Sequence, residues 1–159
     1  MVMCMHYSAT AAIEEHGSNE VRRAIASGTH LSTLAFSETG SRSHFWVPLS
    51  TATADGDRVL LNASKSWVTS AGEADSYVWT SRPVSAPTGA TLWLVPSRSA
   101  GLIVTAPFDG LGLRGNASSP VLATDVSLPA SAPMVPASTS PSASSYPYSR
   151  CSTRRAASA

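Results

Sequence analysis

TATADGDRVLL, residues 51–61, is the clearest structural signal in this sequence. Its Asp-Gly pair separates two runs that favour extended structure, and such a pair is typical of a tight turn between antiparallel strands. We therefore expect a β-hairpin here. Other short runs on both sides of it also favour strands, and glycine or proline separates them; they cover residues 30–37, 66–69, 76–80, 91–95, 102–105 and 121–126.

The spacing of these runs indicates a mainly β domain. Short strands that recur roughly every 8–12 residues, with turn residues between them, are typical of sandwiches and barrels, and they do not fit alternating strands and helices. We predict an antiparallel β-barrel-like domain over residues 30–133, in which about 100 residues are enough to enclose a core.

The residues before this domain have a helical pattern. Ala9, Ala12, Ile13 and His16 recur at spacings of three and four residues, and Gly17 interrupts the run. Ser18 then suits a helix N-cap, and a glycine at position 28 suits a helix end. The sequence predicts two short helices, or one helix broken at the first glycine, within residues 8–27.

The C-terminal residues 134–159 have a different composition. They are rich in Ser, Ala and Pro, and their few large side chains follow neither a helical nor a strand period. Such a segment buries too little apolar surface to offset the entropy lost on ordering. We predict a disordered tail. Both a natural linker and a frame-shifted translation would give this composition.

The overall composition excludes several classes of function. The chain has 159 residues, of which 13% are charged, and its formal net charge is +1. This balance provides no field that would hold nucleic acid or an anionic membrane. No apolar run is long enough to span a membrane, no secretory signal is recognisable, and two cysteines at opposite ends suggest neither disulfides nor a metal site. We predict a cytoplasmic protein.

Two motifs with possible chemistry are weak. Ser41, Ser43 and His44 are close in sequence, but a nucleophilic triad requires partners that converge in space with an orienting acid. The run GLGLRG, residues 110–115, has the glycine spacing of a dinucleotide-binding loop without a helix after it, so a glycine-rich turn is the better interpretation.

A third motif, KSWVTSAG at residues 65–72, suits a flat ligand. Trp67 and Thr69 are two residues apart, so on a regular strand both side chains project from the same face. An aromatic wall beside a hydroxyl favours a heteroaromatic ligand, which needs stacking area and a few hydrogen bonds. A core tryptophan beside a hydrogen-bonded threonine would give the same pattern, and that alternative stays open here.

The motifs together resemble the middle β-domain of the flavin-dependent acyl-CoA dehydrogenases. That family has a loop (T/S)-E-P-x-A-G-S-D and, about 25 residues later, a strand G-x-K-x-(W/Y)-(I/V)-(T/S)-(N/S)-(A/G)-G. A turn G-(L/M)-R-x-(S/T) and a closing V-P strand follow. This sequence has SETGSRSH at 37–44, NASKSWVTSAG at 62–72, GLRGN at 112–116 and VSLP at 126–129. Its departures from the pattern include Thr39, Arg42, His44 and Asn116.

The resemblance implies FAD as cofactor and assigns roles to individual residues. Ser37 would hydrogen-bond the pyrimidine side of the flavin, Trp67 would pack against the isoalloxazine, and Thr69 would reach the nitrogen that accepts the hydride. Leu34 and Phe36 would contribute backbone contacts and part of the side wall of the binding site near the ring. Ser43 would contact the thioester arm of an acyl-CoA substrate.

The resemblance also implies a parent enzyme larger than this chain. Residues 1–29 correspond to the end of an N-terminal helical domain, and no segment resembles the C-terminal helical domain that carries the catalytic carboxylate. We therefore assign no catalytic residue and expect the fragment to be inactive alone. The parent would be a homo-oligomer of fatty acid metabolism that desaturates acyl-CoA and passes electrons to an acceptor flavoprotein. The alternative is a non-catalytic remnant, or a small interaction module without flavin.

Overall fold

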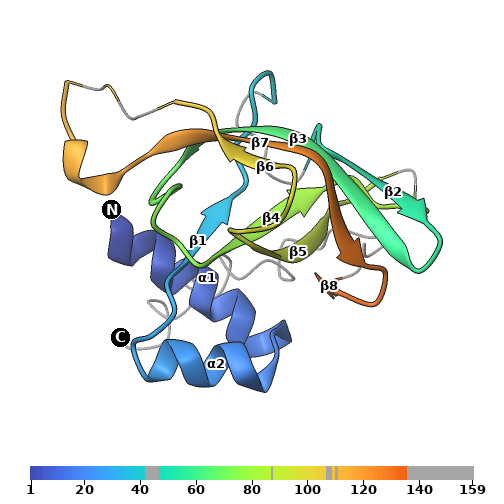
Figure 1. Cartoon of the computed structure of the whole chain (residues 1–159), viewed down its shortest axis with the longest axis horizontal. Helices are drawn as coiled ribbons and strands as arrows, with labels where there is room; N and C mark the ends of the chain where they lie inside the picture. The colour runs from blue at the N-terminus through green and yellow to red at the C-terminus, as the bar shows by residue number, and fades with distance from the viewer. Residues whose placement is uncertain (42–46, 87, 107–108, 110, 136–159) are drawn as a thin grey trace, which may run out of the picture.

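A computed structural model describes residues 1–41, 47–86, 88–106, 109 and 111–135. Two helices lie below two β-sheets in the view of Figure 1. One sheet has the strand order β1-β4-β5-β8 and the other has the order β2-β3-β7-β6. The elements of the first sheet are β1 (Ser32–Ala35), β4 (Ser76–Ser81), β5 (Thr91–Pro96) and β8 (Pro133–Val135).

The second sheet is built on two long strands. β3 (Arg58–Val68) pairs antiparallel with β7 (Ser119–Pro129), and the shorter strands β2 (Thr51–Asp55) and β6 (Leu102–Val104) flank them. β2 and β3 form the hairpin predicted from the Asp-Gly pair, with Asp55 opposite Arg58. The predicted strands 58–61 and 66–69 are joined in one strand that ends at Val68, and its pairing with β7 is irregular at two places.

The described strands form two separate sheets that do not close into a barrel. The mainly β domain was predicted correctly, and its two sheets are arranged as a sandwich. One pairing is not antiparallel: β1 runs parallel to β4, with Ser32 opposite Ser76. The chain leaves β1, forms the β2–β3 hairpin in the other sheet and returns to β4. The side-chain pattern of a strand does not encode its direction, so this pairing could not be predicted from alternation.

The first sheet is buried on both faces because it lies between the second sheet and the helices. Tyr77, Trp79 and Trp93 point into the core between the sheets, where residues such as Leu61 and Val126 meet them. Val78 and Leu92, from the opposite face, join a second cluster against the helices. All six residues of β4 are buried for this reason.

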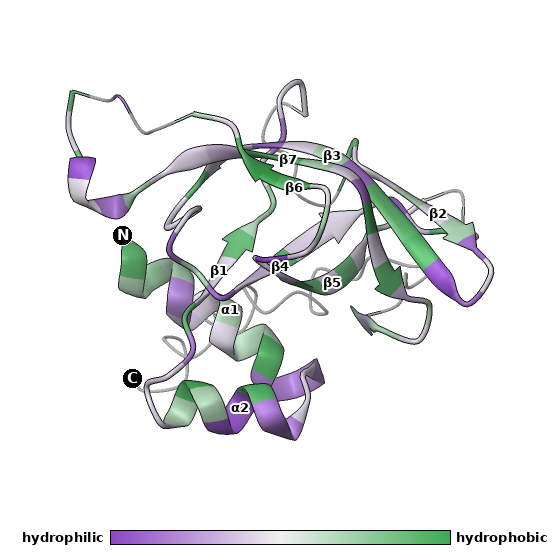
Figure 2. Cartoon of the chain, viewed as in Figure 1, coloured by the Kyte–Doolittle hydropathy of each residue, from purple (hydrophilic) through white to green (hydrophobic). Residues whose placement is uncertain are grey.

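The break between the two helices lies where the sequence predicts it. α1 (Val2–His16) ends at Gly17, and α2 (Asn19–Ala26) begins after Ser18, whose hydroxyl accepts a hydrogen bond from the backbone of Val21. α1 begins earlier than the predicted residue 8. α2 has no buried residue and carries mixed hydrophilic and hydrophobic segments, as Figure 2 shows.

At the C-terminal end, β8 includes Met134, which is buried against the helices. Residues 134 and 135, which the sequence analysis counted with the tail, therefore lie in a strand. The rest of the predicted tail, residues 136–159, lies outside the described residues. Among the described residues, no helix is long and apolar enough to cross a membrane.

Candidate functional site

The segments that carry Ser37 and Trp67 lie side by side. The Ser66 N–H donates to the carbonyl of Ser37 over 2.9 Å, and the Thr39 N–H donates to the carbonyl of Ser64 over 3.4 Å. Glu38 and Lys65 form an antiparallel bridge between these bonds. The chain just after β1 therefore runs along the last part of β3, and the two predicted flavin-binding motifs meet at one edge.

Trp67 projects into solvent. Its side chain is 66% exposed, so the alternative of a core tryptophan is wrong for this residue; Trp79 and Trp93 are buried instead. Its backbone has φ 55°, in the left-handed region, at the pairing irregularity between Lys65 and Val68. Such a bulge redirects a side chain out of the regular alternation.

Thr69 does not share the face of Trp67, contrary to the expectation for a regular strand, because it is only 6% exposed. Its hydroxyl lies 3.3 Å from that of Ser118. The following N–H groups, of Ser70 and Ala71, donate to the carbonyls of Asn116 and Ala117. The bulge and these bonds place Thr69 beneath the surface that carries the indole.

Several non-glycine residues around Thr69 have a left-handed backbone. Ser70 has φ 56°, Leu113 has φ 57° and Ala117 has φ 47°. Such conformations disfavour side chains by about 1–2 kcal/mol each and cluster at functional sites, where the surrounding structure holds them. The two segments, 67–71 and 113–118, form one strained and hydrogen-bonded unit.

The other predicted site residues differ in their exposure. Ser37 is exposed, Phe36 is half-buried, and Leu34 is buried in the cluster against the helices. The side chain of Leu34 therefore packs against the helices, and its strand partner is Val78. Ser43 lies outside the described residues. The structure brings the segments of Ser37 and Trp67 together, while Thr69 is buried against Ser118.

A buried ion pair lies directly behind this edge. Lys65 is fully buried, and its Nζ lies 2.5 Å from Oε1 of Glu38. The same ammonium contacts the Thr80 carbonyl at 2.7 Å, the Thr80 hydroxyl at 3.0 Å and the Ser50 hydroxyl at 3.2 Å. It also lies 5.0 Å from the centre of the Trp79 ring, close enough for a cation–π contact.

Sequence reasoning did not identify this pair, although a signal was present. The loop and strand patterns quoted for the family both specify a charged residue, Glu in the first and Lys in the second, and this sequence has Glu38 and Lys65 there. A lysine on the buried face of a strand needs a partner, since burying an unpaired charge is costly.

Both members of the pair are charged near neutral pH. Burial raises the pKa of Glu38, but Lys65, the Ser50 hydroxyl and the Leu49 N–H together outweigh that effect and hold the pKa below its ordinary value. Burial lowers the pKa of Lys65 to about 8, against the opposing effect of Glu38. The network is therefore an ionic one at pH 7.

The lowered pKa of Glu38 predicts acid sensitivity. The folded pKa is below the unfolded one, so the stabilisation is complete above the unfolded value of 4.5 and is lost as pH falls through the folded value. We expect the free energy of unfolding to fall below pH 4.5 less steeply in the double variant Glu38→Gln/Lys65→Met than in the wild type. Urea unfolding at several pH values measures this, and equal slopes would contradict it.

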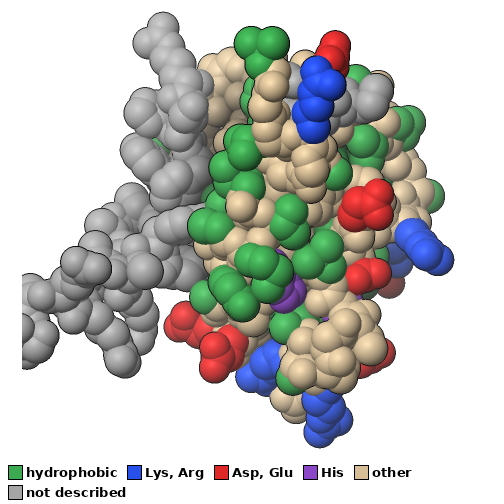
Figure 3. Space-filling view, turned by 90° about the vertical axis from the view of Figure 1, so that its left-hand side faces the viewer, with side chains coloured by type: hydrophobic (Ala, Val, Ile, Leu, Met, Phe, Trp, Pro, Cys, Tyr) green, Lys and Arg blue, Asp and Glu red, His purple; other side chains and the backbone are tan. Residues whose placement is uncertain are grey.

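The face next to this edge carries exposed hydrophobic side chains. The first turn of α1 and the 3-10 helix η1 (Arg114–Asn116) line a shallow hollow, and Figure 3 shows hydrophobic side chains gathered on this side of the molecule. Exposed side chains that line the hollow include Met1, Met3 and Leu113.

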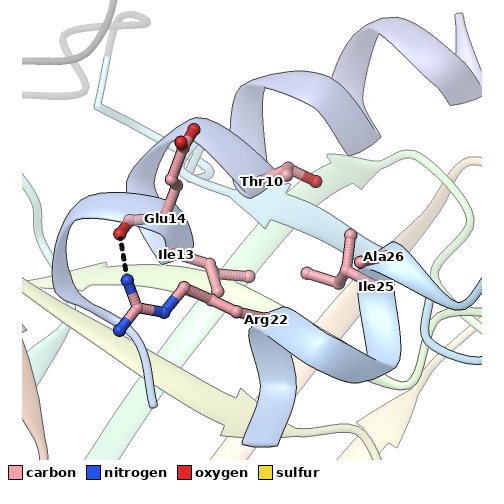
Figure 4. Close-up of a pocket in the computed structure, with 6 residues that line it drawn as sticks. All are labelled: Thr10, Ile13, Glu14, Arg22, Ile25 and Ala26. Carbon is pink, nitrogen blue, oxygen red and sulfur yellow. Dashed lines mark hydrogen bonds between the residues drawn. The ribbon is translucent and has the colours of Figure 1, made fainter. Parts of the chain in front are cut away.

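A separate hollow of about 400 Å³ lies between the two helices. Figure 4 shows its lining side chains, and there the guanidinium of Arg22 donates to the carbonyl of Glu14 over 2.9 Å. None of its six lining residues belongs to the edge that carries Trp67; they are Thr10, Ile13, Glu14, Arg22, Ile25 and Ala26. This hollow is therefore distinct from the candidate site.

Comparison with known proteins identifies the family. A family model described as acyl-CoA dehydrogenase, middle domain, matches residues 33–126, which include both motifs of the candidate site. The chain belongs to the acyl-CoA dehydrogenase family. Its relatives include the human mitochondrial short-chain specific acyl-CoA dehydrogenase, 32% identical over 124 residues that make up 74% of this chain and 30% of that protein. Another is the probable acyl-CoA dehydrogenase YngJ of Bacillus subtilis, 30% identical over 67% of this chain and 29% of that protein.

Solved structures of the family agree in fold. Glutaryl-CoA dehydrogenase of Mycobacterium smegmatis is 26% identical, with a TM-score of 0.76 over 87% of this chain and 36% of that one. A second structure of a glutaryl-CoA dehydrogenase from this organism, in complex with FADH2, has a TM-score of 0.71 and 26% identity over 82% of this chain and 34% of that one. The chain thus spans about a third of the length of these relatives.

Proposed function

We propose that this chain provides the flavin-facing and acyl-CoA-facing β-domain of an acyl-CoA dehydrogenase-like oxidoreductase. The observation that carries the proposal is the outward indole of Trp67 beside the exposed Ser37, held by a hydrogen-bonded bridge at the meeting point of the two motifs. A related glutaryl-CoA dehydrogenase is described in complex with FADH2, which supports a flavin as the ligand.

The residues at this edge fit an isoalloxazine ring. An aromatic side chain exposed on one side offers stacking area, and Ser37 offers a hydroxyl for a ring edge. FAD, when bound, supplies the hydride-accepting chemistry of such enzymes. In this proposal Trp67 excludes water from one ring face and Ser37 orients the ring. Thr69 lies beneath that surface, with its hydroxyl on Ser118.

The substrate, electron acceptor and compartment belong to the proposal for the whole enzyme. We propose acyl-CoA as substrate, an electron-transferring flavoprotein as acceptor, a homo-oligomeric parent and a role in fatty acid metabolism, because the relatives are named acyl-CoA dehydrogenases. A cytoplasmic location stays a prediction, since one named relative is mitochondrial and another is bacterial. No catalytic residue is assigned within this chain.

The purified chain tests the flavin proposal directly. We expect a yellow protein whose flavin absorbance comigrates with it in gel filtration, or a colourless protein that regains this absorbance with added FAD. If the chain showed no FAD binding at concentrations up to the millimolar range, the result would favour the alternative of a remnant or interaction module without flavin.

Truncation of the exposed indole tests the proposed contact. We expect Trp67→Ala to weaken FAD binding about fivefold or more, because stacking on an aromatic side chain contributes on the order of 1 kcal/mol or more. Tyr7→Ala is a matched control, since this side chain is 64% exposed but lies on α1. Isothermal titration with FAD measures both, and equal affinities for the two variants would argue against Trp67 as the flavin contact.

A further inference from the structure

The Lys65–Glu38 pair connects three parts of the chain behind the candidate site. Glu38 follows β1, Lys65 belongs to β3, and Thr80 belongs to β4 in the other sheet. The ammonium binds the carboxylate and the carbonyl of Thr80, so one buried charge joins both sheets at this point.

Glu38 extends the connection to the start of β2. Its carboxylate accepts hydrogen bonds from the backbone N–H groups of Leu49 and Ser50 and from the Ser50 hydroxyl. That hydroxyl also contacts the Thr80 carbonyl at 2.7 Å. Every oxygen of the carboxylate therefore has a partner, as a buried charge requires.

The pair is adjacent in sequence to the exposed edge. Glu38 follows Ser37, Lys65 precedes Ser66 by one residue and Trp67 by two, and the Ser66 N–H to Ser37 carbonyl bond lies between them. A strand that must enter a left-handed conformation at Trp67 needs a fixed point just before it, because that conformation is disfavoured intrinsically. Lys65 is the fixed point that the structure offers.

We propose that Lys65 and Glu38 are positioning residues for the candidate flavin surface: the buried pair holds Ser37 and Trp67 at a fixed separation. This inference rests on the proposed function, because the surface matters only if flavin binds there. The pair does not touch the ligand. Its effect passes through the backbone bridge at 37–39 and 64–66.

Amide hydrogen exchange tests the positioning without any ligand. The readout is the exchange rate of the Ser66 amide divided by that of the Ala130 amide. The Ser66 N–H belongs to the bridge, whereas the Ala130 N–H donates to the Asp57 carbonyl at the far end of β3 and serves as the reference. We expect Lys65→Met and Glu38→Gln each to raise this ratio at least about tenfold, since local opening at the bridge becomes easier. A uniform loss of stability would raise both rates together and leave the ratio unchanged, which would overturn the proposal.

Rescue by the neutral double variant separates pairing from packing. In Glu38→Gln/Lys65→Met, the amide nitrogen in the place of Oε1 can donate to the Ser50 hydroxyl, while the remaining oxygen still accepts from Leu49 and Ser50. We expect the ratio to return to within about threefold of the wild type, since a matched neutral pair can replace a buried ionic one. A double variant no better than the single ones would count against the proposal.

Two further variants serve as a stability control and as a substitute test. Val95→Ala removes buried volume from the core between the sheets and should destabilise the fold without changing the ratio. If Lys65→Met does not fold, Ser50→Ala keeps both charges and removes the hydroxyl that joins Glu38 to Thr80, and it should still raise the ratio. An unchanged ratio in Ser50→Ala would then overturn the proposal.

The flavin experiment distinguishes the two proposals. With FAD added, we expect Glu38→Gln to bind at least about tenfold more weakly than the wild type and to change the visible circular dichroism of the bound flavin, with recovery in the double variant. If the wild type bound no FAD, the proposed function would be refuted. The exchange ratio would still test whether Lys65 and Glu38 hold the bridge in place. A wild type that binds FAD, with Glu38→Gln unchanged in affinity and spectrum, would refute the positioning alone.

Discussion

Lys65→Met is expected to lower the free energy of unfolding by about 3–5 kcal/mol at pH 7, because it leaves the carboxylate of Glu38 buried without its cation. The loss is large because Lys65 is fully buried and the side chain of Glu38 is only 3% exposed, so water cannot replace the missing partner. Urea unfolding followed by far-ultraviolet circular dichroism measures it.

Arg58→Met is the matched control on the same strand. Arg58 is exposed and bonds to Ser127 on the neighbouring strand, so losing its charge should change stability by less than about 1 kcal/mol. If Lys65→Met cost no more than this control, the Lys65 ammonium would have to be solvated, and its role as a link between the two sheets would be refuted.

Gly101→Ala is expected to cost about 3 kcal/mol or more, through a backbone clash and an unfavourable backbone conformation together. A β-carbon at Gly101 would lie 2.1 Å from the carbonyl oxygen of Thr124, and the residue has φ +83°. Its own carbonyl accepts the Thr124 N–H, so β6 and β7 would have to separate for the methyl group to fit.

Gly56→Ala isolates the conformational part of that loss. Gly56 also has a positive φ, +61°, but a β-carbon there meets no atom within 4 Å. It should therefore cost only about 1–2 kcal/mol, the usual cost of a left-handed side-chain residue. Thermal or urea unfolding of the two variants gives the difference, and equal losses would show that the close approach at Gly101 relaxes without cost.

The hairpin at 51–61 and the helix break at Gly17 could be predicted because their signals are local. An Asp-Gly turn and a serine N-cap act within a few residues of the chain, so their effect does not depend on the rest of the fold. The resemblance of 37–44 and 62–72 to a family pattern was equally visible, and the match of the family model to residues 33–126 confirms it.

The orientation of the site residues could not be predicted in the same way. Alternation places Trp67 and Thr69 on one face, but a bulge and a left-handed backbone turn the indole into solvent and leave the threonine buried. A bulge depends on the pairing of β3 with β7, which involves residues about 50 positions apart in sequence, and no local pattern specifies it.

Local sequence therefore determines where the chain turns, where its helices begin and which segments extend, because these choices depend on neighbouring residues. Tertiary structure decides that Lys65 is an internal cation, since only the return of the chain from β1 through β3 to β4 brings Glu38 and Thr80 to it. The cost of burying a charge makes that arrangement specific: Lys65 is stable inside the protein only where a carboxylate and a carbonyl from distant segments converge on it.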